Sequence, residues 1–113
     1  MSDKKYLTVK QAFALAVKSY ENNNLQGAQN YYQRVLEIDP NYAQAHNNLG
    51  VIFTTLAENQ KARNCYEKAI EIDPNYAQAH NNLGTIFRTL GEIQKSISCY
   101  KKAIEIDPKY LEA

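Results

Sequence analysis

The side chains that could bind a metal or carry redox chemistry are spread along this sequence at one interval. His46 and His80 are 34 residues apart, and so are the two cysteines, Cys65 and Cys99. Neither histidine has a second ligand one helical turn away, as a zinc site on a helix would need. Equivalent positions on neighbouring helices lie roughly 10 Å apart, which is too far for a disulfide. We therefore interpret all four as packing residues and expect no cofactor and no metal.

The acidic side chains do not favour catalysis either. General acid–base chemistry needs two groups that converge on one substrate, whereas Glu58, Glu67 and Glu92 fall on expected turns or outer helix faces. The sequence also lacks a nucleophile elbow, a phosphate-binding loop and a Cys/His pairing. We predict that the chain is not an enzyme.

Two pairs of asparagines are the strongest candidates for binding. Asn47 and Asn48 precede Leu-Gly, and Asn81 and Asn82 repeat this arrangement. A carboxamide has a donor and an acceptor, so a row of carboxamides can pair with the backbone of an extended peptide. Asn is a mediocre helix former, which favours a reason for two per helix. Solvated residues copied between similar repeats are the alternative interpretation.

The chain is built from a repeated unit. Residues 39–53 recur at 73–87 with one mismatch, Val51 against Thr85. The Asp-Pro pairs keep the same interval and stand at 39–40, 73–74 and 107–108. A fixed period of this length indicates a stack of identical supersecondary units. Such a stack has a long surface groove and no enclosed reaction chamber, so binding is the expected function.

Apolar residues within each unit recur at spacings of three and four, which is typical of amphipathic helices. In the second unit the two stripes are Ala45, Leu49, Ile52, Phe53 and Leu56, then Ala62, Tyr66, Ala69 and Ile70. A short break separates the stripes. Each unit is therefore predicted to be a helix–turn–helix hairpin.

Local signals predict where the helices begin and turn. Thr8 and Gln11 have the spacing of a capping box, so the first helix should begin near Val9. Each Asp-Pro pair should end one hairpin and open the next, with the Asp as a candidate N-cap. The turns within the hairpins are expected around Asn23, Ala57 and Gly91. Alanine tolerates a left-handed turn worse than Asn or Gly, by about 1 kcal/mol.

Small and aromatic residues occupy matching places in the units. The second unit reads His46-x2-Leu49-Gly50-x2-Phe53, Ala62-x3-Tyr66, Ala69 and Pro74. The third matches as His80, Leu83, Gly84, Phe87, Ser96, Tyr100, Ala103 and Pro108, and the first is a weaker copy with Ala12, Leu15, Ala16, Ser19, Ala28, Tyr32, Val35 and Pro40. This pattern resembles the tetratricopeptide repeat family, whose period and signature it shares.

The resemblance implies an all-α fold, an α–α superhelix (solenoid) of three tetratricopeptide repeats. The expected repeats are 9–42, 43–76 and 77–110. Residues 1–8 would form an N-terminal extension, and residues 111–113 would start a truncated fourth repeat.

In this family the first helix of each repeat lines a concave groove, which implies a set of peptide-binding residues. The set is Asn48, Asn82, Asn47, Asn81, Gln44, Gln78, Thr85, Arg88, Phe13, Val17 and Tyr20. Asn48 and Asn82 would bond the peptide backbone, and the asparagine pattern resembles the ladder in the repeat arm of O-linked N-acetylglucosamine transferases. The family's two-carboxylate clamp fits poorly, because only Asn48 matches its pattern.

Charge and composition restrict the partners. With 13 Lys and Arg against 12 Asp and Glu, nothing favours nucleic acid or an acidic membrane surface. No apolar run of about 18 residues is present, and the start of the chain lacks the apolar core of a signal peptide. Reduced thiols fit a cytoplasmic protein.

We predict a protein–protein interaction scaffold that binds an extended peptide segment in the concave groove. One alternative is a self-assembling structural unit, a homo-oligomer formed through an uncapped apolar C-terminal face around Ile97, Tyr100 and Ile104. The other is the substrate-recruiting arm of a larger transferase.

Overall fold

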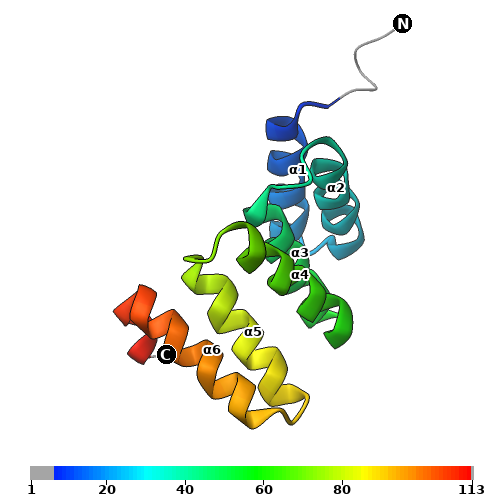
Figure 1. The fold of residues 1–113 in the computed structure, drawn as a ribbon. Coiled ribbons are helices and arrows are strands. Elements are labelled where there is room, and N and C mark those ends of the chain that lie inside the picture. Colours follow the sequence, from blue (N-terminus) through cyan, green and yellow to red (C-terminus); the bar gives the residue numbers. More distant parts are fainter. Residues whose placement is uncertain (1–6, 113) are drawn as a thin grey trace, which may run out of the picture.

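The computed structural model describes residues 7–112, which form three helical hairpins stacked in one row (Figure 1). The elements are α1 (Val9–Glu21), α2 (Leu25–Ile38), α3 (Ala43–Thr55), α4 (Asn59–Ile72), α5 (Ala77–Thr89), α6 (Ile93–Ile106) and a short 3₁₀ helix, η2 (Pro108–Glu112). Within the hairpins α1 packs on α2, α3 on α4 and α5 on α6, while α2 packs on α3 and α4 on α5 between hairpins. The all-α solenoid predicted from the sequence is confirmed.

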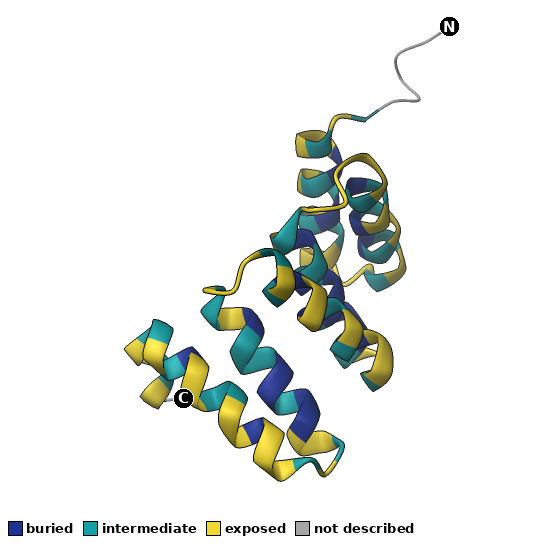
Figure 2. Cartoon of the chain, viewed as in Figure 1, coloured by how far each residue is buried: buried dark blue, intermediate teal, exposed yellow. Residues whose placement is uncertain are grey.

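A small residue facing a tyrosine ring lets the two helices of each hairpin approach closely. A Cβ atom added at Gly50 would lie 2.6 Å from the Tyr66 ring, and one added at Gly84 would lie 2.9 Å from the Tyr100 ring. Ala16 takes this place in the first hairpin and is fully buried. Figure 2 shows buried residues concentrated where helices meet, whereas α6 carries mainly exposed and intermediate residues.

The capping box at the start of α1 is confirmed. The backbone N–H of Gln11 donates to Thr8 Oγ1 at 3.0 Å, and the backbone N–H of Thr8 donates to Gln11 Oε1 at 2.9 Å. Helix α1 begins at Val9, as predicted.

The expected N-cap role of the aspartates is wrong at Asp39 and Asp73. Helix α3 begins at Ala43 after Tyr42, without a side-chain cap. Asp39 instead ends α2, and its Oδ1 accepts the backbone N–H of Asn41 at 3.1 Å. Asp73 makes the same contact with the backbone N–H of Asn75, ahead of α5. At these two positions the short Asp side chain closes a turn within the loop. Asp107 directly precedes η2, and its Oδ1 accepts the backbone N–H of Lys109 in the first turn of that helix at 3.2 Å, which is an N-cap contact.

The histidines pack against these loops. His46 Nε2 lies 2.9 Å from the Pro40 carbonyl oxygen, and His80 Nε2 lies 2.9 Å from that of Pro74. With the proton on Nε2, each ring ties an inter-hairpin loop to the following helix. Within residues 7–112, no group of three or more His, Cys, Asp or Glu gathers as a metal site, and no helix combines the length and apolar character that crossing a bilayer requires.

All three turns within hairpins place one residue in the left-handed region. The φ angles are 61° at Asn23, 61° at Ala57 and 81° at Gly91. The sequence therefore located these turns correctly. Ala57 is the residue least suited to its backbone conformation, because its Cβ approaches the following carbonyl.

We expect Ala57→Gly to raise the free energy of unfolding by about 0.5–1 kcal/mol, since relief of the left-handed strain exceeds the added freedom of the unfolded chain. Urea denaturation followed by circular dichroism measures this change. Ala14→Gly, on an exposed face inside α1, is the matched control and should lower stability by about 1 kcal/mol. A loss of stability in both variants would contradict the assignment.

Candidate functional site

A hollow of about 420 Å³ lies between the hairpins and is lined by α1, α2, α3 and α5. Its lining residues are Val17, Tyr20, Glu21, Tyr32, Asn48, Val51 and Gln78. It brings together four predicted site residues, namely Val17, Tyr20, Asn48 and Gln78. We call this the first hollow.

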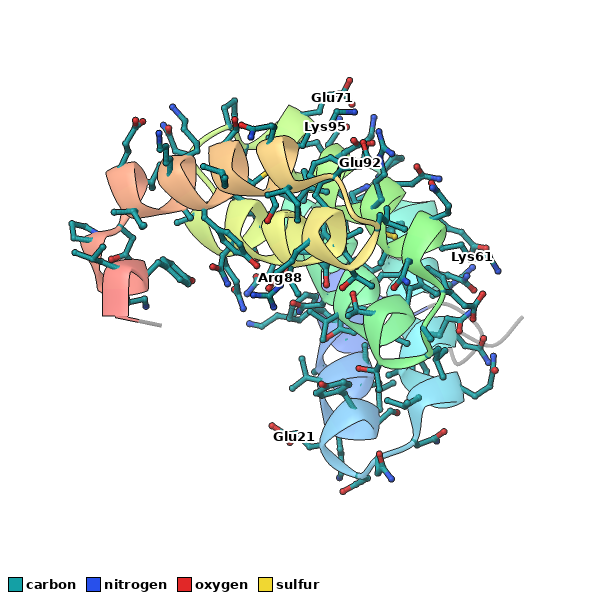
Figure 3. The ribbon with its side chains drawn as sticks, turned by 90° about the horizontal axis from the view of Figure 1, so that it is seen from below. Glu21, Lys61, Glu71, Arg88, Glu92 and Lys95 are labelled. Carbon is teal, nitrogen blue, oxygen red and sulfur yellow. The ribbon has the colours of Figure 1, made fainter. Side chains whose placement is uncertain are left out.

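Figure 3 shows the side of the molecule on which this surface lies. Glu21 and Arg88 project on the inner side of the bend between α1 and α5, whereas Lys61, Glu71 and Lys95 lie on the outer side. The inner side is the concave groove expected from the repeats.

A second hollow of about 390 Å³ lies beside α5, α6 and η2. It is lined by Asn81, Thr85, Arg88, Tyr100, Ile104, Tyr110 and Leu111. Three predicted site residues, Asn81, Thr85 and Arg88, therefore gather at the opposite end of the groove from Tyr20. The Arg88 guanidinium lies over the Tyr100 ring, 6.0 Å from its centroid.

The amides of Asn48 and Asn82 are half-buried and held by different partners. Asn48 Nδ2 donates to the Tyr32 hydroxyl at 3.1 Å, and Asn82 Nδ2 donates to Asn47 Oδ1 at 3.1 Å. Asn82 thus bonds the preceding hairpin. Asn48 cannot copy this contact, because the residue equivalent to Asn47 in the first hairpin is Phe13, which has no acceptor. Neither Oδ1 atom accepts a hydrogen bond from residues 7–112.

Asn47 does not lie on an exposed row as expected. Its side chain is 0% exposed, and its Nδ2 has no hydrogen-bond partner in the described part of the chain. Burial raises the pKa of Tyr76, and the neighbouring Asn47 amide opposes this rise, although no hydrogen bond of good geometry joins them. The side chain is enclosed because α5 covers it, so we assign Asn47 to the contact between hairpins.

Phe13 occupies the corresponding place one repeat earlier. Its ring stacks on Tyr42 with a centroid separation of 5.1 Å and meets Tyr32 edge-on at 5.6 Å. Phe13 lines neither hollow and lies in the contact between the first and second hairpins. Gln44 is exposed but also lies outside both hollows.

Three equivalent tyrosines bring hydroxyl groups towards the groove. Tyr32 accepts from Asn48, whereas the hydroxyls of Tyr66 and Tyr100 lie 2.9 Å from Oγ1 of Thr54 and Thr85. Burial raises the pKa of Tyr66 to about 12. Sequence reasoning treated these tyrosines only as packing residues, because ring burial hides the position of the hydroxyl.

The cysteines are free thiols and half-buried among the described residues. Burial raises the pKa of Cys65 to about 11. Burial also raises the pKa of Cys99, and the Glu67 carboxylate adds to this rise. Both thiols are therefore protonated at neutral pH, which makes them poor nucleophiles.

Two family models match the chain. The tetratricopeptide repeat model matches residues 77–110, and a second model, described as TPR repeat, matches residues 18–56 and 58–91. The chain therefore belongs to the tetratricopeptide repeat family. Repeats of this family are generally protein–protein interaction modules. No curated protein matches the sequence.

Solved structures share the fold. Two crystal structures of MamA superpose with TM-scores of 0.85 and 0.82 at 25% and 26% identity, covering 94% and 93% of this chain. The chain spans 62% and 57% of those two MamA chains. The TPR domain of Arabidopsis OM64 has a TM-score of 0.86 at 20% identity, covering 89% of this chain and 84% of that domain.

We expect the free energy of unfolding to fall as the pH rises above about 9. In the unfolded chain Cys65 and Tyr66 ionise near 9.0 and 10.0, whereas burial holds their folded pKa values at about 11 and about 12. Their contribution to stability is complete below the unfolded pKa and is lost as the pH rises towards the folded pKa. Urea denaturation at pH 7, 9, 10 and 11 measures the loss. Cys65→Ala should remove the part that begins near pH 9, and identical profiles for both proteins would contradict this origin.

Proposed function

We propose that this chain is a non-catalytic interaction module that holds an extended peptide segment of a protein partner along its concave face. The observation that supports this most strongly is the first hollow, because residues from all three hairpins contribute to it. A ligand there would contact α1, α3 and α5 together, which matches a segment that runs across the repeats. We also propose that the module acts in the cytoplasm, as expected from the sequence.

Asn48 and Asn82 would bond the peptide backbone. Each amide uses one N–H in a bond to the protein, which leaves a second N–H and the Oδ1 oxygen for a ligand. The existing bond also fixes the orientation of the amide. Less side-chain freedom is then lost on binding, which favours affinity. Two such amides one repeat apart would act as the asparagine ladder that the sequence resembles.

The remaining site residues would act around this pair. Gln44, Gln78, Asn81, Thr85 and Arg88 would select side chains of the peptide. Val17 and Tyr20 would supply an apolar end, and Phe13 and Asn47 would support the groove from within the contacts between hairpins. The same groove could serve as the substrate-recruiting arm of a larger transferase, which the flanking coding sequence would reveal.

We expect the double variant Asn48→Ala, Asn82→Ala to bind peptides about five- to 150-fold more weakly, because two hydrogen bonds of about 0.5–1.5 kcal/mol each are lost. The probes are peptides selected on the wild-type protein from a random display library. Calorimetry would measure affinity, and circular dichroism should show unchanged helix content.

Two variants control for damage to the fold. Tyr32→Phe breaks the bond to Asn48, and Asn47→Ala breaks the bond to Asn82, but both keep the groove amides. Both should lose less affinity than the double variant, because only the fixed orientation of an amide is lost. Equal weakening in the controls, or unchanged affinity in the double variant, would exclude the backbone-binding role.

Self-association is a second candidate function, favoured by the exposed apolar face of α6. Ile93 is 51% exposed and Ile97 is 42% exposed. End-to-end stacking of copies is disfavoured, because the residues equivalent to Phe87 and Glu92 in the first hairpin are Ser19 and Asn24. Between the second and third hairpins, Arg63 of α4 contacts the Phe87 ring and the Glu92 carboxylate. Ser19 and Asn24 provide neither a ring nor a carboxylate, so this contact could not form on the first hairpin of another copy. Association would therefore pair two α6 faces.

Sedimentation velocity at increasing concentration tests this association. We expect the wild-type protein to grow in apparent mass with concentration and Ile97→Lys to stay monomeric, because a lysine in the apolar face opposes burial. Ile38→Lys, at a position that is also 42% exposed, should behave like the wild type. A wild-type protein that remains monomeric throughout would exclude the idea.

A further inference from the structure

Glu21 in the first hollow differs from the other glutamates in its ionic surroundings. Six glutamates between residues 7 and 111 each have a Lys or Arg nitrogen within 4.0 Å, and these are Glu37, Glu58, Glu67, Glu71, Glu92 and Glu105. Glu21 has no such partner in the described part of the chain, although it lines the first hollow. Its carboxylate is therefore available to a cation from outside the chain.

The end of α1 makes this place more negative. Glu21 is the last residue of the helix, and the free carbonyl groups at a helix C-terminus carry a partial negative charge. The carboxylate adds to that charge instead of compensating it. Lys18, the basic residue of the last turn, is exposed and has no ion pair with Glu21 at 4.0 Å or less.

The charge of Glu21 also reaches the floor of the hollow. Burial is the main reason that the pKa of Tyr32 is raised, and the Glu21 carboxylate contributes to the rise. Tyr32 in turn holds the Asn48 amide through its hydroxyl. The negative group, the aromatic floor and the proposed backbone-binding amide thus belong to one site.

The other walls suit the stem of a long basic side chain. Val17 and Val51 provide aliphatic surface, and Tyr20 is 42% exposed. Lys and Arg bury their methylene groups along apolar surface while the charged head stays accessible. The head is attracted both by a carboxylate and by the face of an aromatic ring.

We propose that the first hollow binds a lysine or arginine side chain of the peptide that occupies the groove, with Glu21 as the ion-pair partner. This inference rests on the proposed function, because it names a side chain of the same ligand. The preference is confined to one end of the groove, since the second hollow contains the positively charged Arg88. A basic side chain of the peptide is therefore favoured in the first hollow and disfavoured in the second hollow.

The test selects peptides from one random display library on four proteins in parallel. These are the wild type, Glu21→Gln, Glu21→Lys and Glu37→Gln, the last being the matched control on the exposed face of α2. We expect wild type and Glu37→Gln to enrich Lys or Arg at one peptide position. Glu21→Gln should lose this enrichment, and Glu21→Lys should enrich Asp or Glu there.

Calorimetry with one selected basic peptide measures the interaction directly. Glu21→Gln should weaken its binding about two- to fivefold at 50 mM salt, with a smaller difference at 500 mM because salt screens an exposed pair. Replacement of the basic residue of the peptide by norleucine should weaken binding to the wild type more than binding to Glu21→Gln, in which only the attraction to the aromatic ring remains. Circular dichroism checks that all four proteins have the same helix content.

The outcomes separate this inference from the function on which it rests. Peptides that bind the groove without a basic preference, or equally well to Glu21→Gln, would overturn the role of Glu21 and leave peptide binding in place. Failure of the wild type to select any peptide would overturn both. Loss of the enrichment in Glu37→Gln as well would show a general charge effect and would also overturn the assignment.

Discussion

The contact between a small residue on the first helix and a tyrosine ring on the second determines the geometry of each hairpin. At Gly50 and Gly84 a single added carbon would enter the ring of Tyr66 or Tyr100. In the second and third hairpins the ring occupies this space because that carbon is missing. In the third hairpin the Tyr100 hydroxyl lies at the second hollow, 2.9 Å from Oγ1 of Thr85, which also lines that hollow. Packing and binding surface therefore depend on one contact.

The second and third repeats share a nearly identical first helix and the first repeat is a weaker copy, and the polar contacts of all three differ. The hydroxyls of Tyr32, Tyr66 and Tyr100 bond an asparagine of the next hairpin or a threonine of their own hairpin. The difference arises from neighbouring positions at which the repeats diverge. Thr85 stands where the second repeat has Val51, and Arg88 stands where it has Thr54, so the threonine that bonds the tyrosine hydroxyl comes from a different position in these two repeats. A few substitutions thus give each part of the groove its own chemistry.

Features that depend on local sequence were predictable. The capping box at Thr8, the left-handed turn at Ala57 and the hairpins follow from residues close together in the chain, and the structure has them. Features that depend on how two hairpins pack against each other were not predictable from the sequence. The burial of Asn47 follows from the position of α5, which no periodicity reports. Its repeat equivalent Asn81 faces a hollow.

The role of the aspartates was not predictable for a different reason. A residue such as Asp39 can cap a following helix or close a turn of its own, and both uses have the same sequence signal. The position of Tyr42 decides between them, because α3 begins only after it. The sequence predicts the candidate site only as a set of helix positions. In the structure Tyr32 and Glu21, which were not in that set, line the first hollow beside the predicted residues.

The two contacts between hairpins differ in one component. The first combines the stacked rings of Phe13 and Tyr42 with the hydrogen bond from Asn48 to Tyr32, whereas the second combines the hydrogen bond from Asn82 to Asn47 with the ion pair of Arg63 and Glu92. Salt screens an exposed ion pair but leaves ring stacking largely unaffected. A change of ionic strength would therefore act on the second contact more than on the first.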